Sequence, residues 1–552
     1  MAEVVDAGRA SDARPALPSP WVVAAVGIAV IVAVPVLAIL SSLGTPATAI
    51  WAHLWRTQLV ELGWNTVRLL IGVGAGTLVV GTGLAWLVVH HRFPGRAVFE
   101  WALILPLAVP AYVIGFAALG LFEFSGPVQS GLRRLLGDGL RLPEVRSYGG
   151  VTLMMTLVFY PYVYLLARAA FREQGVAVLE TARSLGRSRL GAFVSVTLPM
   201  ARPSLAAGVA LAMMEALADF GTVATYGYRT FTEAIYRVWY GMFDRIAATQ
   251  LASVLLLFAF ALLALERASR GRQRFTQAHR RRPVVVPQPL HGWRAAAATG
   301  ACLAVLTFAF LLPVGRLAWW ALEAVIAGRV SREFGALLAN TVFLAALASA
   351  AACVLAVVLA YAGRLDPSQQ VRLATQFASM GYALPGSVIA VGVLLPLAWL
   401  DHGLGAMVSA ALGRPVGLLL TGSAVALVAA YVVRFLAVSL QTVDASLARV
   451  SPNLDDAARS LGAGVGGALR RVHLPLIRTG LVTALILVFV ETMKEMPATL
   501  LLRPFGLNTL AVAVWEGTSE ALWQEAAVPA LAIVAAGMIP VLLAIRWSAA
   551  DR

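Results

Sequence analysis

Two stretches of this chain carry nearly the same sequence, and both are polar segments in an otherwise apolar protein. Glu180–Pro199 reads ETARSLGRSRLGAFVSVTLP, and Asp456–Pro475 reads DAARSLGAGVGGALRRVHLP. The two stretches align without a gap, at an offset of 276 residues, as far as Arg202 and Arg478. A repeat on this scale predicts that the chain consists of two copies of one structural unit.

Each copy contains signals for a short helix, a turn and the start of a new helix. The opening acidic residue is typical of a helix N-terminus, where it opposes the positive end of the helix dipole. Gly186 and Gly462 suit the left-handed residue that ends a helix. Pro199 and Pro475 lack an N–H group and suit the first turn of the next helix. We therefore expect both repeated segments (residues 180–199 and 456–475) to be rigid docking elements, not plain connecting loops.

The composition identifies an integral membrane protein. Hydrophobic residues make up 60% of the 552 residues, charged residues only 13%, and the mean hydropathy is +0.80. The net charge of +15 does not indicate nucleic-acid binding. Much of it comes from arginines clustered in residues 267–294, as is typical of the cytoplasmic side of a membrane protein. Cys302 and Cys353 lie in apolar runs, which argues against a disulfide framework or a zinc site.

Apolar runs predict an all-α protein with twelve transmembrane helices in two sets of six. The first run, Trp21–Leu40, holds no charge, and about 20 apolar residues suffice to span a bilayer. We interpret it as a retained span because its N-terminal flank is acidic and it is longer than a signal-peptide core. The predicted spans are residues 21–42, 65–89, 98–121, 149–169, 203–223, 247–265, 295–320, 341–363, 373–400, 418–440, 479–500 and 526–547.

The repeat also extends over the spans and predicts their orientation. Pro110–Ile114 (PAYVI) resembles Pro385–Ile389 (PGSVI). A unit of six spans begins and ends on the same side of the membrane, so the two halves should be parallel. The basic linker then places both chain termini and both repeated segments in the cytoplasm. Four arginines in residues 122–148, on the predicted outer side, argue against this orientation but are partly offset by three acidic residues there.

The expected organisation has five parts. They are a cytoplasmic tail (1–20), a first half (21–266) with its polar loop at 170–202, a basic cytoplasmic linker (267–294), a second half (295–547) with its polar loop at 441–478, and a short tail (548–552).

The repeated segments resemble the EAA motif of ABC-importer permeases, which reads E-A-A, three residues, G, nine residues, I-x-L-P. The departures are mild, since Thr181 replaces an alanine, Asp456 replaces the glutamate, and valine replaces isoleucine. In that family the motif is the coupling helix that seats in a groove of the ATPase subunit. The positions that match are Glu180, Ala182, Gly186, Leu198, Pro199, Asp456, Ala458, Gly462, Leu474 and Pro475.

This resemblance implies a fold, a location and partners. We expect a type I (MetI-like) permease in the inner membrane, crossing it many times and surrounded by lipid, with both termini in the cytoplasm. Two coupling loops imply two copies of an ABC ATPase, which would bind ATP and Mg²⁺. The family also implies a periplasmic or lipid-anchored substrate-binding protein.

The chain is not expected to be an enzyme or to hold a cofactor of its own. A P-loop requires the pattern G-x-x-x-x-G-K-[ST]. The sole lysine, Lys494, follows Thr492 and Met493 inside an apolar run, so it cannot serve in that pattern. A membrane-embedded enzyme or assembly scaffold is an alternative, but we find no motif of a nucleophile, base or metal site that would support the enzyme.

Four acidic residues in apolar runs are candidates for a translocation pathway. Glu215 and Asp219 lie in the fifth span, and Glu491 and Glu495 lie at the matching positions of the eleventh. Buried ionisable groups are costly in a membrane and mark pathways. The i, i+4 spacing predicts that each pair shares one helix face, and the two halves would bring all four together. Lys494 would temper the charge, either by pairing with Glu491 at i−3 or by lying beside Glu495.

Such oxygen ligands suit a hard cation, so the four acids are candidate transient Fe³⁺ contacts, although no metal site is certain. The alternative is that they are solvated at the outer end of the helix, or form a structural pair with Lys494.

Two further stretches resemble the fused ferric-iron permeases, and this resemblance covers essentially the whole chain. They are residues 218–236, which include ADFGT and TFTEAIY, and residues 491–504, which read ETMKEMPATLLLRP. The resemblance implies transport of ferric iron. Importers of thiamine, aminophosphonate, sulfate or polyamine share the fold and remain alternatives. An ion-coupled secondary transporter is an alternative of another class.

Overall fold

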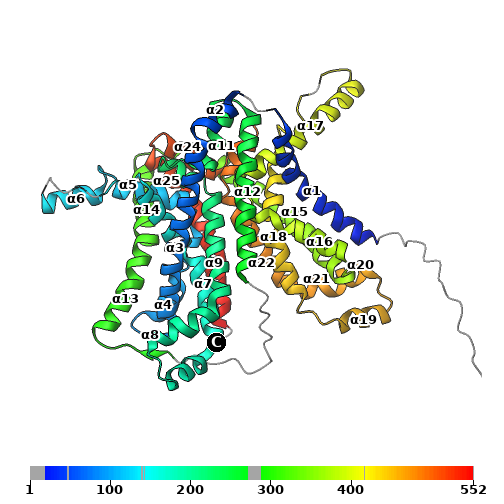
Figure 1. Ribbon diagram of the computed structural model, residues 1–552. Helices are drawn as coiled ribbons and strands as arrows, with labels where there is room; N and C mark the ends of the chain where they lie inside the picture. The colour runs from blue at the N-terminus through cyan, green and yellow to red at the C-terminus, as the bar shows by residue number, and fades with distance from the viewer. Residues whose placement is uncertain are drawn as a thin grey trace, which may run out of the picture.

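The computed structural model describes residues 19–46, 49–137, 141, 143–270, 287–415 and 417–550. Most of the predicted N-terminal tail and of the basic linker therefore lies outside the described residues. The described chain is a bundle of helices (Figure 1). In this part of the chain the one β-pairing joins two-residue strands, His91–Arg92 (β1) and Gln288–Pro289 (β2), so the all-α prediction is confirmed.

The first half consists of α-helices with short 3-10 or π-helical turns between them. They are α1 Pro20–Ser41, η1 Ser42–Gly44, α2 Ala49–Thr57, α3 Leu59–His90, α4 Arg96–Ala102, η2 Leu105–Ala108, α5 Ala111–Phe122, α6 Pro127–Leu136, α7 Tyr148–Ser184, α8 Arg189–Ala192, η3 Phe193–Thr197, α9 Leu198–Ala218, α10 Gly221–Thr225, α11 Phe231–Tyr236, η4 Arg237–Gly241 and α12 Arg245–Arg270.

The second half repeats this arrangement with different breaks. Its elements are α13 Trp293–Leu306, η5 Thr307–Leu311, α14 Leu312–Ile326, α15 Phe334–Leu365, α16 Gln369–Ala378, η6 Ser379–Ala383, α17 Gly386–Leu412, α18 Ala424–Leu447, α19 Asn453–Ser460, α20 Val465–Ala468, η7 Leu469–His473, α21 Leu474–Leu476, α22 Arg478–Met493, α23 Pro497–Leu502, α24 Leu510–Ser519 and α25 Trp523–Ala550.

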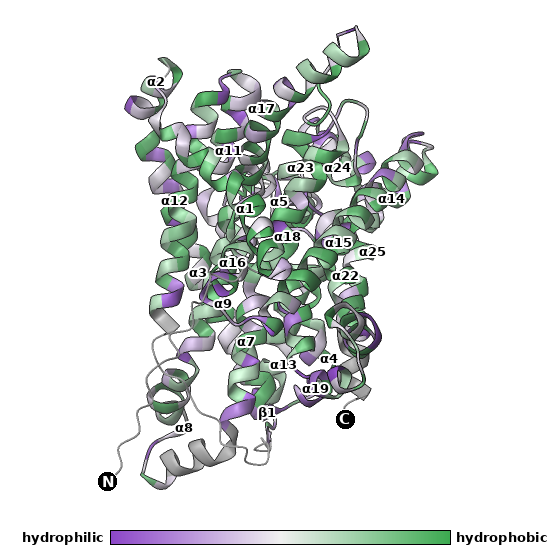
Figure 2. Cartoon of the chain, turned by 90° about the vertical axis from the view of Figure 1, so that its right-hand side faces the viewer, coloured by the Kyte–Doolittle hydropathy of each residue, from purple (hydrophilic) through white to green (hydrophobic). Residues whose placement is uncertain are grey.

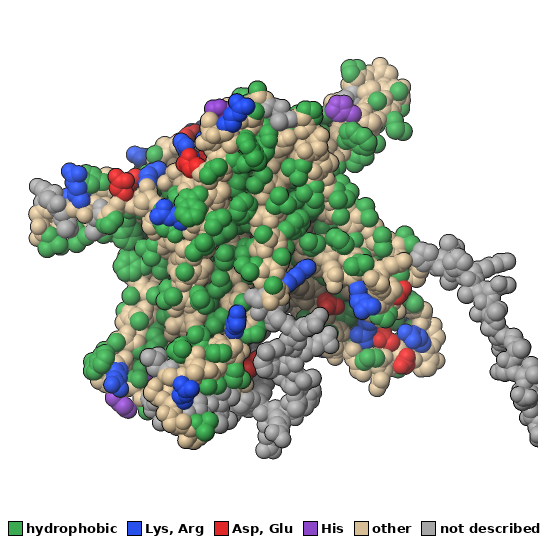
Figure 3. Space-filling model, in the orientation of Figure 1, with side chains coloured by type: hydrophobic (Ala, Val, Ile, Leu, Met, Phe, Trp, Pro, Cys, Tyr) green, Lys and Arg blue, Asp and Glu red, His purple; other side chains and the backbone are tan. Residues whose placement is uncertain are grey.

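The helices are long and apolar enough for a protein that crosses the membrane many times. Within the described residues, eleven helices have the length and hydropathy of a membrane span. A twelfth is obtained if residues 465–476 and α22, which meet at an angle of 76°, are counted as one span. Hydrophobic residues dominate the middle of the molecule (Figure 2), and charged side chains gather towards its two ends (Figure 3).

Four of the predicted continuous spans are interrupted, so those predictions were wrong. The predicted span 98–121 is divided into α4 and α5, and 373–400 is divided into α16 and α17. The predicted spans 203–223 and 479–500 end early, at Ala218 and Met493. The breaks fall at matching positions of the two halves, so they belong to the repeated unit.

Proline explains the first pair of breaks. Pro110 and Pro385 stand immediately before the first residues of α5 and α17, and the residues that precede them, Val109 and Leu384, are extended. A residue before proline is disfavoured in the helical region, so the 3-10 turns η2 and η6 end there and do not run on into α5 and α17. Hydropathy remains high across these positions, which is why apolar runs alone predicted a continuous helix.

The two halves run in the same direction through the bundle. Helices α8 and α19, which belong to the two repeated segments, lie at the same end of the molecule in both views (Figures 1 and 2). The C-terminal end of the chain lies at this end too. This arrangement agrees with the prediction of parallel halves.

The first helix of each half packs against the other half. Helix α1 contacts α15, α16 and α17, and helices α13 and α14 contact α4 and α5. A stack of Phe116 from α5, Trp320 from α14 and Trp523 from α25 joins the halves. Residues 21–266 and 295–547 are therefore repeats in sequence, but they exchange their first helices in the fold.

Close backbone contact at Gly392 supports this exchange and provides a test. A Cβ atom at Gly392 would lie 2.6 Å from the carbonyl oxygen of Pro35 in α1. We expect Gly392→Leu to destabilise the protein by about 1–3 kcal/mol, the usual cost of overpacking. Thermal unfolding in detergent measures the effect.

The matched control is Gly403→Leu on the same helix, where a Cβ would meet nothing within 4 Å. If both variants unfold at the wild-type temperature, α1 does not pack closely against α17.

Candidate functional site

The second repeated segment folds as predicted into a short helix, a turn and a new helix. Asp455 and Asp456 lie in the first turn of α19, and Gly462 has a φ of +78°. A left-handed residue at this position ends the helix and turns the chain. Pro475 lies in the first turn of the short helix α21, and both it and Leu474 remain at least partly accessible.

The first repeated segment differs in its opening helix. Residue 180 lies in the last turns of α7, which runs without interruption from Tyr148 to Ser184. The prediction that Glu180 opens a helix was therefore wrong, because α7 continues where α18 stops and α19 begins. The side chains of Glu180 and Ala182 lie outside the described residues. Gly186 is left-handed as predicted, with a φ of +83°.

Both segments expose the leucine that precedes this glycine. The side chain of Leu185 is 78% exposed and that of Leu461 is 87% exposed. Ala458, in contrast, is buried against the protein. Sequence analysis did not single out these leucines, although an apolar residue conserved between two polar copies was a usable signal. Each segment thus carries a strongly exposed leucine next to its left-handed glycine.

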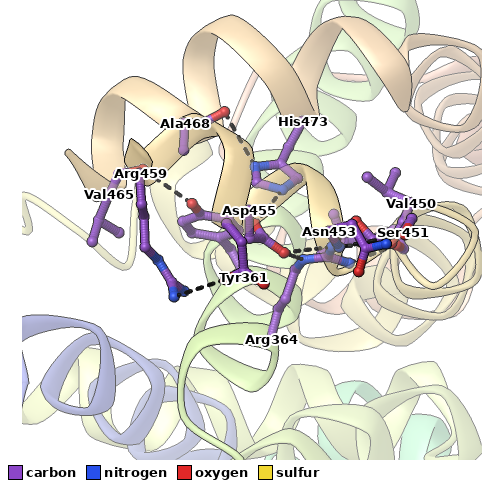
Figure 4. A network of polar contacts seen from close by, with 12 residues as sticks. Tyr361, Arg364, Val450, Ser451, Asn453, Asp455, Arg459, Val465, Ala468 and His473 are labelled. Atoms are coloured by element: carbon purple, nitrogen blue, oxygen red, sulfur yellow. Dashed lines mark hydrogen bonds and ion pairs between the residues drawn. The ribbon is translucent and has the colours of Figure 1, made fainter. Parts of the chain in front are cut away.

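A polar network holds the second segment to the transmembrane helices (Figure 4). Asp455 lies between Arg364, at the C-terminal end of α15, and His473. Arg364 donates to Oδ2 of Asp455 at 2.6 Å from Nη2 and 3.0 Å from Nε. Nε2 of His473, a fully buried side chain, lies 2.8 Å from Oδ1. Asp455 was missed in the sequence because its neighbour Asp456 occupies the motif position.

Arg364 also joins this segment to the preceding helix. It donates to the carbonyl oxygens of Leu447, at the end of α18, and of Val450, each at 3.0 Å. The last carbonyls of a helix lack partners within it, and arginine is well suited to bind them. One guanidinium group therefore connects α15, α18 and α19, so that these elements move together.

The first segment is held by aromatic packing instead. Trp86 of α3, which matches Tyr361 of α15, contacts Phe193 at 4.2 Å and His90 at 3.8 Å between ring centroids, with the rings tilted. Phe171 contacts the same cluster. A hydrogen bond from Gln174 of α7 to the carbonyl oxygen of Thr197, at 3.1 Å, adds to this packing. The first segment is thus anchored by aromatic packing and a neutral hydrogen bond, and the second by an ionic network.

The pKa of Asp455 supports an ionic role. Burial alone would raise the pKa of this carboxyl group, but hydrogen bonds and charge from Arg364, with His473, hold it below the usual value of 3.8. A lowered folded-state pKa means that the ionised form stabilises the fold. That stabilisation is present above the pKa of the unfolded chain and is lost as the pH falls through the folded value.

We predict that Asp455→Asn loosens α19 in the pH range where the carboxylate is charged. Loss of a charge-assisted hydrogen bond costs about 2 kcal/mol, so the amides of α19 should open roughly thirtyfold more often. Hydrogen exchange at neutral pH measures this. Acidification below about pH 4 should weaken wild-type protection, after correction for intrinsic exchange, and leave the variant nearly unchanged.

Asp456→Asn is the matched control, because the side chain of Asp456 is 75% exposed. Its ion-pair partner Arg459, at 3.4 Å, is exposed to solvent as well. Exposed pairs of this kind contribute little. Equal protection of α19 in wild type and Asp455→Asn would contradict the role of the network.

A second candidate site is a cavity of about 90 Å³ in the middle of the bundle, hereafter the central cavity. All four acidic residues predicted from the sequence line it: Glu215, Asp219, Glu491 and Glu495. They come from both halves, so the halves do bring them together. The expected i, i+4 helix face is wrong, however, because α9 ends before Asp219 and α22 ends before Glu495.

The helix breaks fix two of these carboxylates. Asp219 accepts hydrogen bonds from the backbone N–H and hydroxyl of Thr222, at 2.7 and 3.0 Å. At the equivalent position, Glu495 accepts from the backbone N–H of Ala498 at 3.0 Å. Each carboxylate therefore binds the first turn of the short helix that follows its break, as an N-cap does.

The other two carboxylates have side-chain partners. Tyr382 donates to Glu215 at 2.9 Å, and Lys494 pairs with Glu491 at 2.8 Å, which confirms the predicted i−3 pair. Arg434 of α18, which sequence analysis missed, lies 3.3 Å from Glu495. As a lone arginine within an apolar run it was a detectable signal.

No group of three or more His, Cys, Asp and Glu side chains among the described residues is arranged to hold a metal ion. The acids converge without forming a metal centre in this conformation. Phe220, which lines the cavity, contacts Tyr236 of α11 and Trp515 of α24, both at 4.8 Å between ring centroids. Those helices lie at the end away from the repeated segments in both views. The lining thus combines fixed charges with an aromatic side chain, Phe220, that contacts both of these helices.

Comparisons with known proteins agree with these features. Residues 77–272 match the family described as binding-protein-dependent transport system inner membrane component. The chain is 28% identical to the Fe(3+)-transport system permease protein FbpB 2 of Haemophilus influenzae, over 90% of this chain and 91% of that protein.

Two shorter relatives have other names. Identity is 30% to the sulfate transport system permease protein CysT of Escherichia coli, over 39% of this chain and 78% of that protein. Identity is 29% to the molybdenum transport system permease protein ModB of Escherichia coli, over 31% of this chain and 71% of that protein. This chain therefore belongs to the family of binding-protein-dependent transport system inner membrane components, the transmembrane permeases of ABC importers.

Proposed function

We propose that this chain is the permease through which an ABC importer moves ferric iron into the cell. The observation that carries the proposal is the convergence of four carboxylates from two repeats on one cavity inside the bundle. Ionisable groups at such depth are retained where a polar substrate passes. The likeness to a permease named for Fe(3+) transport, over nine-tenths of both chains, supports the same cargo.

The charge of the lining favours a cation over an oxyanion. Four carboxylates face two basic side chains, Arg434 and Lys494. A sulfate or molybdate ion would be repelled by the acidic excess, whereas oxygen ligands suit a hard cation. The relatives named for sulfate and molybdenum therefore indicate the fold and the coupling mechanism of this chain, and not its substrate.

The size of the cavity opposes bulky substrates in this conformation. Pockets for drug-sized ligands have volumes of about 300–1,000 Å³. The central cavity, at about 90 Å³, holds an ion with a few water molecules but not thiamine or a large organic chelate. An ion released from its carrier fits best.

Energy would come from partner ATPases seated on the two repeated segments. One ATPase per segment gives two copies, each with its own ATP and Mg²⁺, and a substrate-binding protein outside the cell would deliver the iron. Both chain termini then lie in the cytoplasm. The exposed leucines Leu185 and Leu461 are the apolar contacts of the seats, and Arg364 carries the movement of the second seat into α15 and α18.

Substitution of the seat leucines tests this docking. Leu461→Arg should weaken ATPase binding by about ten- to a hundredfold, because burial of a leucine side chain contributes about 1.5–3 kcal/mol. The affinity of the purified permease for its ATPase, measured at fixed salt, gives the result. Leu418→Arg, a similarly exposed leucine in the connection before α18, at the opposite end of the bundle, is the control. Unchanged affinity in Leu185→Arg and Leu461→Arg would show that the ATPase docks elsewhere.

Uptake into proteoliposomes tests the function as a whole. The vesicles contain the chain, its ATPase and its binding protein, and radioactive Fe³⁺ is supplied with and without ATP on the ATPase side. We expect accumulation that depends on ATP. ATP hydrolysis without iron uptake would be consistent with an ABC importer but would contradict ferric iron as its substrate. Iron uptake that follows an ion gradient, without ATP, would instead indicate a secondary transporter.

Neutralisation of the acids tests the pathway. The double variant Glu215→Gln and Glu495→Gln should reduce uptake to the background level while ATPase binding remains normal, because two of four carboxylates are lost. The control pair, Glu333→Gln and Glu520→Gln, removes two acids that do not line the cavity. Full uptake by the Glu215/Glu495 variant would contradict a pathway through the central cavity.

A further inference from the structure

The wall of the central cavity contains one buried hydroxyl group that the arrangement above leaves unused. Tyr112, the second residue of α5, is 6% exposed and lines the cavity. Among the described residues its hydroxyl has no hydrogen-bond partner. A buried polar group without a partner costs about 1–3 kcal/mol, so such a group in a native protein calls for an explanation.

The hydroxyl lies within electrostatic range of two carboxylates, Glu495 and Asp219. These are the equivalent residues that bind the short helices α10 and α23, so both are held in place by the backbone. Carboxylates that are positioned before a ligand arrives lose little entropy on binding it. Tyr112 therefore completes a group of three oxygen-bearing side chains, in which Tyr112 and Asp219 come from the first half and Glu495 comes from the second.

Arg434 occupies this group loosely. Its Nη1 lies 3.3 Å from Glu495 Oε1, beyond the usual length of about 2.7–2.9 Å for a charge-assisted hydrogen bond. Its Nε is buried and has no partner among the described residues. Both features describe an ion pair that is not optimised. Arg434 also lies within range of Glu215 and Glu491, which can receive it when it leaves Glu495.

We propose that Tyr112, Asp219 and Glu495 form a stopping point for a single dehydrated cation, and that Arg434 is the counter-ion that the cation displaces. The inference rests on the proposed function for the identity of the cation, Fe³⁺. An all-oxygen group that includes a phenol suits a hard trivalent ion. Binding lowers the affinity of the phenol for its proton, which passes to water in the cavity and leaves the phenolate as ligand. Arg434 neutralises Glu495 when the site is empty.

The test combines iron binding with iron uptake. The intact complex in detergent is titrated with Fe³⁺ supplied as its citrate salt, and the visible charge-transfer band of a ferric phenolate is recorded. Tyr112→Phe should abolish the band and lower uptake roughly tenfold, the loss expected for about 1.4 kcal/mol. Tyr226→Phe is the matched control, since this buried tyrosine donates to the Gly115 carbonyl oxygen and does not line the cavity.

Arg434→Gln should act in the opposite direction. If Arg434 competes with the cation, its removal raises the affinity for Fe³⁺, while Arg434→Lys, which keeps the charge, binds more nearly as the wild type does. A purely structural arginine would give weaker binding or an unfolded protein in the glutamine variant. Opposite shifts in Tyr112→Phe and Arg434→Gln are the signature of displacement, and weaker binding in folded Arg434→Gln would overturn it.

The two proposals fail in different ways. If wild type and Tyr112→Phe move iron equally and show the same spectrum, the stopping point is wrong and the function stands. If the wild type shows the band but moves no iron with ATP, the cation site stands and the function is wrong. If the wild type shows neither band nor uptake, both proposals are overturned.

Discussion

The absence of water in the membrane interior is the constraint on which this structure depends. Every backbone N–H, carbonyl and charge that lies there has to find its partner within the protein. The chain nevertheless interrupts helices within the bundle, at Pro110 and Pro385 and again after Ala218 and Met493. At the breaks after Ala218 and Met493, acidic side chains bind backbone N–H groups that the breaks release. Asp219 and Glu495 are therefore pathway candidates and helix caps at the same time.

This dual role explains why the four acidic residues of the cavity were predicted correctly from the sequence, although the predicted geometry was wrong. The four acids stood out because they were charged and apolar residues surrounded them. Their i, i+4 spacing suggested a shared helix face, but the helices end between the members of each pair. The four carboxylates converge instead because the helix breaks direct Asp219 and Glu495 towards the central cavity. Hydropathy averages over such breaks and cannot reveal them, whereas Pro110 and Pro385 were visible signals whose effect was underestimated.

Other features were beyond what one sequence can predict. The internal repeat indicated two parallel halves, but nothing in it shows that α1 packs on the second half and α14 on the first. That exchange depends on close packing, such as the approach of Pro35 to Gly392, which composition does not report. Asp455 was hidden beside the motif residue Asp456, because only the fold shows which of two adjacent carboxylates faces inward. Arg434, in contrast, was predictable from its charge alone.

The cavity and the repeated segments are connected by the way in which charge is balanced. A cavity with four carboxylates and two basic side chains is stable in a membrane only if the remaining charge is compensated. The N-terminal ends of α5 and α17 lie beside it, and helix N-termini carry about half a positive charge each. The backbone at Gly386, the first residue of α17, lies directly against Arg434 and Glu495.

Any movement of α17 or of α18, which carries Arg434, changes this compensation and thereby the affinity for a cation. Helix α18 is held at its other end by Arg364, together with α19. A displacement of the second repeated segment is thus transmitted to the cavity through α18. The first segment reaches α3 and α7 through the aromatic rings of Trp86 and Phe171, which carry no charge. The first segment also continues directly into α9, which carries Glu215, so both segments are connected to charge within the membrane, and only the second adds an ionic link through Arg364.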